Sequence, residues 1–126
     1  MRERIRAIKA PKFHTVSTET RLAAYERIYR QCAGEVAALQ DRAGRYDKDI
    51  TPVYAEKWQE VLAILNECPT AAEIEDMLLS VGFDLAAFEN MYGADRIANG
   101  KLWGKDLKDR YSVLWLYFDL FGGMEA

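Results

Sequence analysis

Residues 111–121 read YSVLWLYFDLF, and this stretch decides the fold. Only Ser112 and Asp119 interrupt its apolar and aromatic side chains, so a helix formed here has no polar side to turn toward water. Such a helix must be surrounded by protein. The stretch therefore predicts either a central helix enclosed by the rest of the chain or a surface that docks on another protein.

The six residues before this stretch read KDLKDR and are almost all charged. Lys105–Arg110 is predicted to be helical, with its charges in water. Ion pairs at i,i+3 and i,i+4 spacing on such a face stabilise a helix by only a few tenths of a kcal/mol each.

Farther upstream, helix start and stop signals are dense, whereas alternating strand patterns and hairpin turns are missing. Residues 17–44 predict a helix that breaks or bends at Gly34 and ends at Gly44. The others are predicted at 51–68, 70–82, 84–93 and 94–121, the last ending at Gly122 and Gly123. The fold class is therefore all-α, a compact bundle of about five or six helices.

Two of these helices have apolar residues at 3–4 spacing, which predicts a buried face on each. The face on 51–68 is made of Tyr54, Trp58, Val61, Leu62 and Leu65. The face on 70–82 is made of Ile74, Met77, Leu78 and Val81.

Residues 1–16 are predicted to be a basic, poorly ordered segment ahead of a helical domain at 17–126. The basic side chains are Arg2, Arg4, Arg6, Lys9 and Lys12. A phosphate-binding or membrane-surface tail is the alternative interpretation. The net charge of −3 argues against a general nucleic-acid binder.

No apolar run approaches the roughly 20 residues that a transmembrane helix needs. The chain has two cysteines, Cys32 and Cys68, far apart in the sequence. With one histidine they cannot form a four-ligand zinc site. Buried free thiols in a cytoplasmic protein are the expectation.

From Lys105 to Gly122 the chain resembles the terminal helix of sn-glycerol-1-phosphate dehydrogenases, in the iron-containing alcohol dehydrogenase superfamily. The order of features upstream is also similar: Trp58 in a helix ending at Cys68-Pro69-Thr70, then Glu73-Ile74, then Gly82. The resemblance covers Tyr54–Gly122 well, Ala33–Gly44 loosely and the first thirty residues poorly. Its motif residues are Lys105, Asp106, Asp109, Arg110 and Tyr111.

The resemblance implies an all-α C-terminal domain of an enzyme that interconverts sn-glycerol 1-phosphate and dihydroxyacetone phosphate. In that family, an N-terminal α/β domain binds NAD(P) through a glycine-rich turn, and the helical domain supplies ligands to a divalent metal such as zinc, iron or nickel. This chain has no such turn and a single histidine, so most of the machinery is missing. Whether the chain is itself an enzyme is therefore uncertain, and alone it is expected to bind neither cofactor.

His14 is the candidate metal ligand, because the family's last ligand histidine also precedes a helix. An ordinary exposed or helix-flanking imidazole is the competing interpretation. Arg110 is expected to anchor the fold, bonding a helix end or a carboxylate. The aromatic residues Tyr111, Trp115, Trp58 and Trp103 are expected in the core.

Two functions follow. The first is the C-terminal helical portion of a glycerol-1-phosphate-dehydrogenase-like enzyme, inactive alone and partnered by a separate nucleotide-binding domain or subunit. The second is a non-enzymatic helical interaction module. Such a module would bind a partner or itself through Tyr111–Phe121, or use its basic N-terminus.

Overall fold

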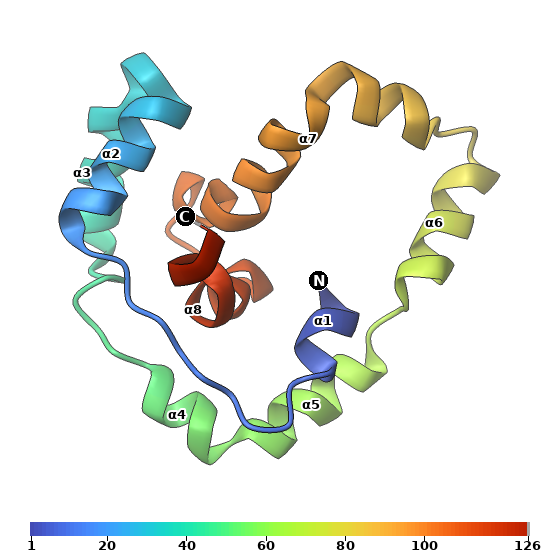
Figure 1. Ribbon diagram of the computed structural model, residues 1–126, viewed down its shortest axis with the longest axis horizontal. Coiled ribbons are helices and arrows are strands. Elements are labelled where there is room, and N and C mark those ends of the chain that lie inside the picture. The colour runs from blue at the N-terminus through green and yellow to red at the C-terminus, as the bar shows by residue number, and fades with distance from the viewer. Residues whose placement is uncertain (126) are drawn as a thin grey trace. The chain divides into compact units, whose positions relative to one another are not determined.

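The computed structural model describes the backbone of residues 1–125 and the side chains of residues 1–123. Within that part of the chain every regular element is helical, which confirms the all-α class. In chain order the elements are α1 (Arg2–Arg6), α2 (Thr18–Tyr29), η1 (Arg30–Cys32), α3 (Ala33–Ala43), α4 (Thr51–Glu56), α5 (Trp58–Glu67), α6 (Ala71–Ser80), α7 (Leu85–Trp103), η2 (Gly104–Leu107) and α8 (Val113–Glu125). Figure 1 shows them coloured along the chain.

The chain forms two compact units, each made of two stretches of sequence. Unit 1 contains Met1–Pro11 and Pro52–Ile97, and unit 2 contains Lys12–Thr51 and Ala98–Ala126. The sequence predicted a single helical domain at 17–126, and the structure assigns residues from that range to both units.

Unit 2 is built on a pair of helices and one apolar helix. Helices α2 and α3 lie side by side, and α3 and α8 each contact η2 (Figure 1). Ser17 begins α2, because its hydroxyl accepts a hydrogen bond from the Thr20 amide. Gly44 ends α3 in the left-handed conformation at φ 60°, as the sequence predicted for a residue with no Cβ.

Most of the apolar stretch that opened the sequence analysis is enclosed. The buried residues of α8 are Trp115, Leu116, Tyr117, Phe118, Leu120 and Phe121. Tyr111 and Val113, at the start of the stretch, are about half exposed. The chain therefore encloses residues 115–118, 120 and 121, which is the first of the two alternatives that the sequence left open.

Helix boundaries differ from the predictions at three places. The helix over 17–44 breaks at η1, where Arg30 has φ 52°, and not at Gly34. The helix over 51–68 divides at Lys57, and the last one breaks at η2 before α8 continues through Gly122 and Gly123. Gly93, expected to stop a helix, has φ 74° and ψ 160°, a non-helical conformation that only glycine adopts easily, so it separates the two helical stretches of α7 as predicted.

Unit 1 has a small core in which α1 packs beside α5 (Figure 1). Ile5 is fully buried, Trp58 and Leu65 are buried, and the indole N–H of Trp58 donates to the Ile8 carbonyl over 3.2 Å. Residues 2–6 of the basic segment thus form an ordered helix whose apolar residue enters the core.

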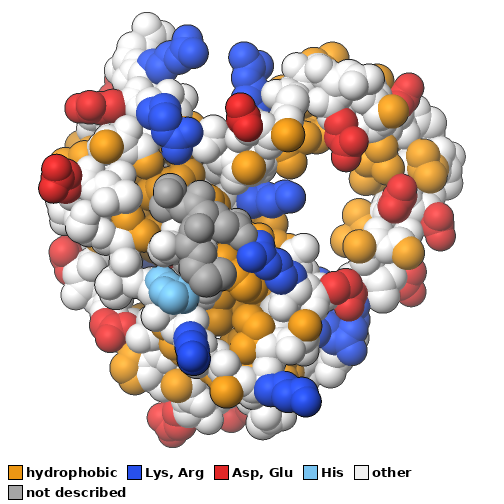
Figure 2. Space-filling model, in the orientation of Figure 1, with side chains coloured by type: hydrophobic (Ala, Val, Ile, Leu, Met, Phe, Trp, Pro, Cys, Tyr) orange, Lys and Arg blue, Asp and Glu red, His pale blue; other side chains and the backbone are white. Residues whose placement is uncertain are grey.

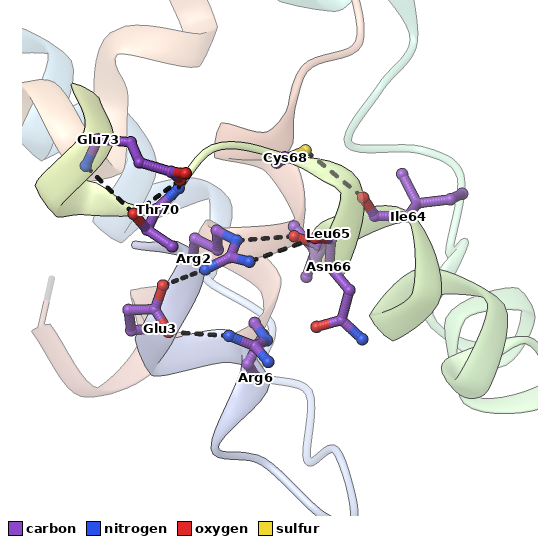
Figure 3. Close-up of polar contacts among 9 residues, drawn as sticks. All are labelled: Arg2, Glu3, Arg6, Ile64, Leu65, Asn66, Cys68, Thr70 and Glu73. Carbon is purple, nitrogen blue, oxygen red and sulfur yellow. Dashed lines mark hydrogen bonds and ion pairs between the residues drawn. The ribbon is translucent and has the colours of Figure 1, made fainter. Parts of the chain in front are cut away.

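Arg2 fastens this first helix to the end of α5. Its Nε donates to the Leu65 carbonyl over 2.8 Å and one terminal nitrogen donates to the Asn66 carbonyl over 3.4 Å (Figure 3). These carbonyls belong to the last turn of α5, where the regular helical amide partners run out, and the Leu65 carbonyl also accepts from the Cys68 amide over 3.3 Å. A charged donor at this end also matches the negative end of the helix dipole.

Helix α6 begins as the sequence predicted. The Thr70 hydroxyl accepts from the Glu73 amide over 3.1 Å, and the Glu73 carboxylate accepts from the Thr70 amide over 2.7 Å (Figure 3). Two amides of the first turn are satisfied in this way. The Phe83 amide donates to the Leu78 carbonyl and closes the other end.

The predicted buried face of α6 is wrong. Ile74, Met77 and Val81 are exposed, and α6 has no buried residue. Their periodicity places these side chains on one side of the helix, but no part of the described chain covers that side. The face predicted on 51–68 is confirmed at Tyr54, Trp58 and Leu65, which are buried.

The prediction of buried thiols is also wrong, because Cys32 and Cys68 are both free and exposed. Cys32 lies in η1 of unit 2, and Cys68 follows α5 in unit 1. Among the described residues, no helix has the length and apolar character to cross a membrane.

Candidate functional site

Unit 2 contains a cavity of about 210 Å³ at the start of α8. Three stretches of the chain form it: the segment before α2, the connection from α3 to the start of α4, and α8 with Tyr111 from the loop before it. The lining residues are His14, Thr15, Val16, Arg45, Tyr46, Lys48, Asp49, Ile50, Thr51, Tyr111, Trp115, Phe118 and Asp119. Charged groups of both signs and aromatic rings thus share one cavity.

Arg45 and Tyr111 form part of the cavity wall. A terminal nitrogen of Arg45 donates to the Asp109 carbonyl over 3.1 Å, and the guanidinium lies 5.9 Å from the centre of the Tyr111 ring. This contact ties the loop before α8 to the loop after α3. The arginine that anchors this region is therefore Arg45, whereas Arg110, predicted for that role, is exposed.

His14 is held by its backbone against α8. Its amide donates to the Asp119 carbonyl over 2.7 Å. A Cβ built on Gly123 would lie 2.6 Å from the Cβ of His14, so a side chain larger than glycine does not fit there without a shift. The two glycines expected to end the last helix thus include one that allows close approach to His14.

Asp119 is the half-buried carboxylate of the cavity. Burial raises its pKa to about 6, although the nearby Lys105 ammonium favours the ionised form. A carboxyl group with such a pKa changes its protonation between pH 5 and 7.

Behind the cavity lies what we call the ionic centre, formed by Tyr46, Lys105 and Asp106. The ammonium of Lys105 donates to the Asp106 carboxylate over 2.7 Å and to the Tyr46 hydroxyl over 2.8 Å. The Tyr46 hydroxyl in turn donates toward the same carboxylate, 2.9 Å and 3.0 Å from its two oxygens. Both members of the ion pair are fully buried at the side chain, so each charge has its partner in the protein and none in water.

Four aromatic rings surround the Lys105 ammonium. Its nitrogen lies 3.6 Å from the centre of the Phe118 ring and 4.7, 5.0 and 5.2 Å from those of Trp115, Trp103 and Tyr46. The negative faces of such rings attract a cation, and the attraction is larger where water is excluded. The rings therefore offset part of the cost of burying this charge.

Burial moves the pKa of each ionisable group in the ionic centre toward its neutral form. It lowers the pKa of Lys105 to about 8 and raises that of Asp106, while the attraction between the two charges opposes both shifts. Burial and the Asp106 carboxylate together raise the pKa of the Tyr46 hydroxyl far above its ordinary value, so this phenol stays protonated. The Lys105 pKa remains above 7, so its ammonium stays protonated at pH 7.

Gln40 fixes the backbone that carries this pair. Its side-chain nitrogen donates to the carbonyls of Asp106 and Lys108 over 2.9 and 3.0 Å. The glutamine comes from α3 and is almost completely buried, so η2 is held from across unit 2.

The family-motif residues fall into two groups in the structure. Lys105 and Asp106 are buried, which contradicts the predicted water-exposed face, while Asp109, Arg110 and Tyr111 are exposed. Tyr111 is thus a cavity wall and not the core aromatic that was predicted. The predicted core positions of Trp58, Trp103 and Trp115 are confirmed.

Sequence reasoning missed Tyr46, Gln40 and Arg45, which lie about sixty residues before their partners. No local pattern marks them, because each acts through the tertiary fold. The one signal in the sequence was the Lys105-Asp106 pair, a few residues before a helix with no polar side.

The residues present do not assemble a metal site within the described chain. His14, Asp49 and Asp119 line the same cavity, but no three described His, Cys, Asp or Glu side chains are placed to hold one ion. The ligand role of His14 stays a prediction.

In comparisons with known proteins, no family model, no curated protein and no solved structure matches the chain.

Proposed function

We propose that this chain serves as the C-terminal helical portion of an enzyme similar to sn-glycerol-1-phosphate dehydrogenases. In this proposal it walls one side of the catalytic cleft, while a separate domain or subunit binds NAD(P) and supplies most ligands to a divalent metal. The chain alone is inactive.

The observation that carries the proposal is the position of the resembling stretch in unit 2. Lys105 and Asp106 open that stretch, and both are buried with hydrogen-bonded partners. Phe118, near its end, contributes the ring closest to the Lys105 ammonium. The stretch that resembles the dehydrogenases is thus the one around which unit 2 packs, and its charged residues Lys105 and Asp106 are part of that packing.

We place the cleft side of the chain at the cavity. His14, the candidate ligand, lines it together with Arg45 and Lys48. Two cations near an imidazole suit a phosphorylated three-carbon substrate, since they can pair with its phosphate oxygens. Phosphate binding would then be the main contribution of this chain to the reaction.

Reconstitution tests this proposal. The chain is co-expressed with the nucleotide-binding half of an established sn-glycerol-1-phosphate dehydrogenase, and the purified complex receives zinc, dihydroxyacetone phosphate and NADH or NADPH. We expect oxidation of the nicotinamide and formation of sn-glycerol 1-phosphate by the complex, and none by either part alone.

The variant Lys48→Gln tests the phosphate contact at an exposed cavity residue, where the change is expected to leave the fold intact. It is expected to raise the KM for dihydroxyacetone phosphate with little change in the amount of complex. Turnover by the isolated chain, or a complex without turnover on this substrate, would contradict the proposal.

A second candidate function is a non-enzymatic helical interaction module. One observation favours it: α6 and the first half of α7 leave large apolar side chains exposed. The sequence had suggested Tyr111–Phe121 as the docking stretch, but most of that stretch is buried. We therefore propose unit 1 as the interacting part under this function.

A further inference from the structure

Six large apolar side chains of unit 1 are exposed along α6, the turn after it and the start of α7. We call them the α6–α7 surface: Ile74, Met77, Val81, Phe83, Phe88 and Met91. Met77 is 55% exposed and Val81 is 79% exposed. Ile74, Met77 and Val81 follow i, i+3, i+7 spacing, so they share one side of the helix.

The turn between the helices is ordered, so this surface does not depend on a loose loop. Phe83 is fixed by the hydrogen bond from its amide to the Leu78 carbonyl. Its ring lies 5.8 Å from that of Phe88, which lies 4.7 Å from that of Tyr92. These aromatic residues contact one another and still keep more than a third of their surface in water.

The segment that carries the surface has charges of one sign, and Arg2 of α1 is a cation beside it, lining a hollow with Glu73, Asp76 and Met77 at the start of α6. Between Trp58 and Asp95 the sequence has eight acidic residues and no lysine or arginine: Glu60, Glu67, Glu73, Glu75, Asp76, Asp84, Glu89 and Asp95. Figure 2 shows acidic and hydrophobic side chains interspersed over α6, with no basic side chain there. An apolar stripe bordered by carboxylates is complementary to an apolar stripe bordered by cations.

We propose that the α6–α7 surface binds a basic amphipathic helix of a partner protein. The apolar face of that helix would cover Met77, Val81 and their neighbours, and its lysines and arginines would pair with the surrounding carboxylates. This inference rests on the second candidate function and not on the dehydrogenase proposal, so the reconstitution assay can succeed or fail independently of it.

Two other occupants fit the charges poorly. A second copy of the chain would bring its own acidic α6 against this one, and like charges across an interface oppose association. Anionic membranes carry the same sign as the surface and would repel it. A basic helix is the occupant that satisfies both the apolar and the charged parts.

Fluorescence anisotropy with a model peptide tests the inference on the full chain. The probe is a labelled 18-residue peptide of leucine and lysine, with leucine at the spacing of one helix face. We expect it to bind about tenfold or more tightly than its leucine–glutamate counterpart, and its affinity to fall about tenfold between 0.05 and 0.5 M NaCl.

Variants locate the binding. Met77→Gln with Val81→Gln removes apolar contacts at exposed positions and should weaken the lysine peptide about tenfold. Glu75→Gln with Asp76→Asn should reduce the salt dependence. Leu107→Gln, at an exposed apolar residue of unit 2, is the matched control and should bind as the parent does, with circular dichroism confirming the fold of each variant.

Four results would overturn the inference. The Met77→Gln, Val81→Gln variant could bind the peptide with unchanged affinity, or the glutamate peptide could bind equally well. Sedimentation could instead show a dimer, or anionic vesicles could retain the chain, through a surface lost in that same variant.

Discussion

The two units of this chain bury very different groups. Unit 2 encloses the aromatic residues of α8 around a lysine–aspartate pair whose two charges are hydrogen-bonded to each other. Unit 1 buries a few side chains between α1 and α5 and leaves α6 without a buried residue. The comparison teaches that one helical unit can complete its own core while its neighbour in sequence leaves an apolar side for something else to cover.

The largest expected effect is in the ionic centre of unit 2. Lys105→Met leaves the Asp106 carboxylate buried without its cation, and we expect the free energy of unfolding to fall by about 3 to 5 kcal/mol. Urea denaturation followed by the fluorescence of the buried tryptophans measures it. The double variant Lys105→Met, Asp106→Leu should regain much of the loss, because no charge is left buried.

Lys57→Met is the control for this experiment. Lys57 pairs with Glu60 over 3.1 Å, but both side chains are more than half exposed. We expect a change within about 0.5 kcal/mol. Equal losses of unfolding free energy for Lys57→Met and Lys105→Met would mean that burial does not change what an ion pair contributes to stability here.

The next effect belongs to the small core of unit 1. Ile5→Ala removes its one fully buried aliphatic side chain, with an expected loss of about 2 to 3 kcal/mol. Hydrogen exchange should show faster opening of α1 and α5 and unchanged protection of α8. Val53→Ala, at an exposed residue of unit 1, should change neither, and a uniform loss of protection would mean that the units unfold together.

A smaller effect depends on pH and again concerns unit 2. Because the pKa of Asp119 is raised from 3.8 to about 6, the folded state binds a proton in a range where the unfolded state does not. The resulting stabilisation is fully present below pH 3.8 and is lost as the pH rises through 6. Asp119→Asn removes this dependence, so its stability relative to the parent should be higher at pH 7 than at pH 4, by about 1 to 2 kcal/mol after allowance for solvent screening.

Asp49→Asn gives the opposite sign. Hydrogen bonds from Thr51 lower the pKa of Asp49, so its stabilisation is present above the unfolded pKa and is lost as the pH falls. Thermal melts at pH 4, 5.5 and 7 distinguish the two variants. Parallel curves for parent and Asp119→Asn would refute the assigned role of burial.

The smallest effect is local to α6. Thr70→Ala removes the hydroxyl that accepts from the Glu73 amide and should cost about 1 kcal/mol. Exchange of the Glu73 amide should quicken, whereas Thr70→Ser, which keeps an acceptor, should leave it nearly unchanged. Because α6 lacks a tertiary core, its cap is a larger share of its stability than a cap in unit 2 would be.

The features that the sequence predicted correctly depend on neighbouring residues. The capping box at Thr70 and Glu73 and the left-handed end at Gly44 involve residues only a few positions apart. The all-α class follows from the same short-range signals. Of the candidate site, the sequence named His14, Tyr111, Lys105 and Asp106, but not the contacts that Lys105 and Asp106 make.

The features that were predicted wrongly depend on contacts that no local pattern records. The charges at Lys105 and Asp106 look like a solvated run until Tyr46 and Gln40, from a distant part of the chain, satisfy them. Ile74 and Met77 have the spacing of a core face, and spacing states which side chains share a side of a helix. Whether that side meets protein or water depends on the tertiary fold.

The exposed cysteines have a consequence for handling this protein. Each unit carries one free thiol, Cys68 in unit 1 and Cys32 in unit 2. A monomer with two reactive ends polymerises when both ends couple, so air oxidation is expected to produce a ladder of covalent multimers on a non-reducing gel. Replacing either cysteine by serine leaves one reactive end, and the ladder should then stop at the dimer.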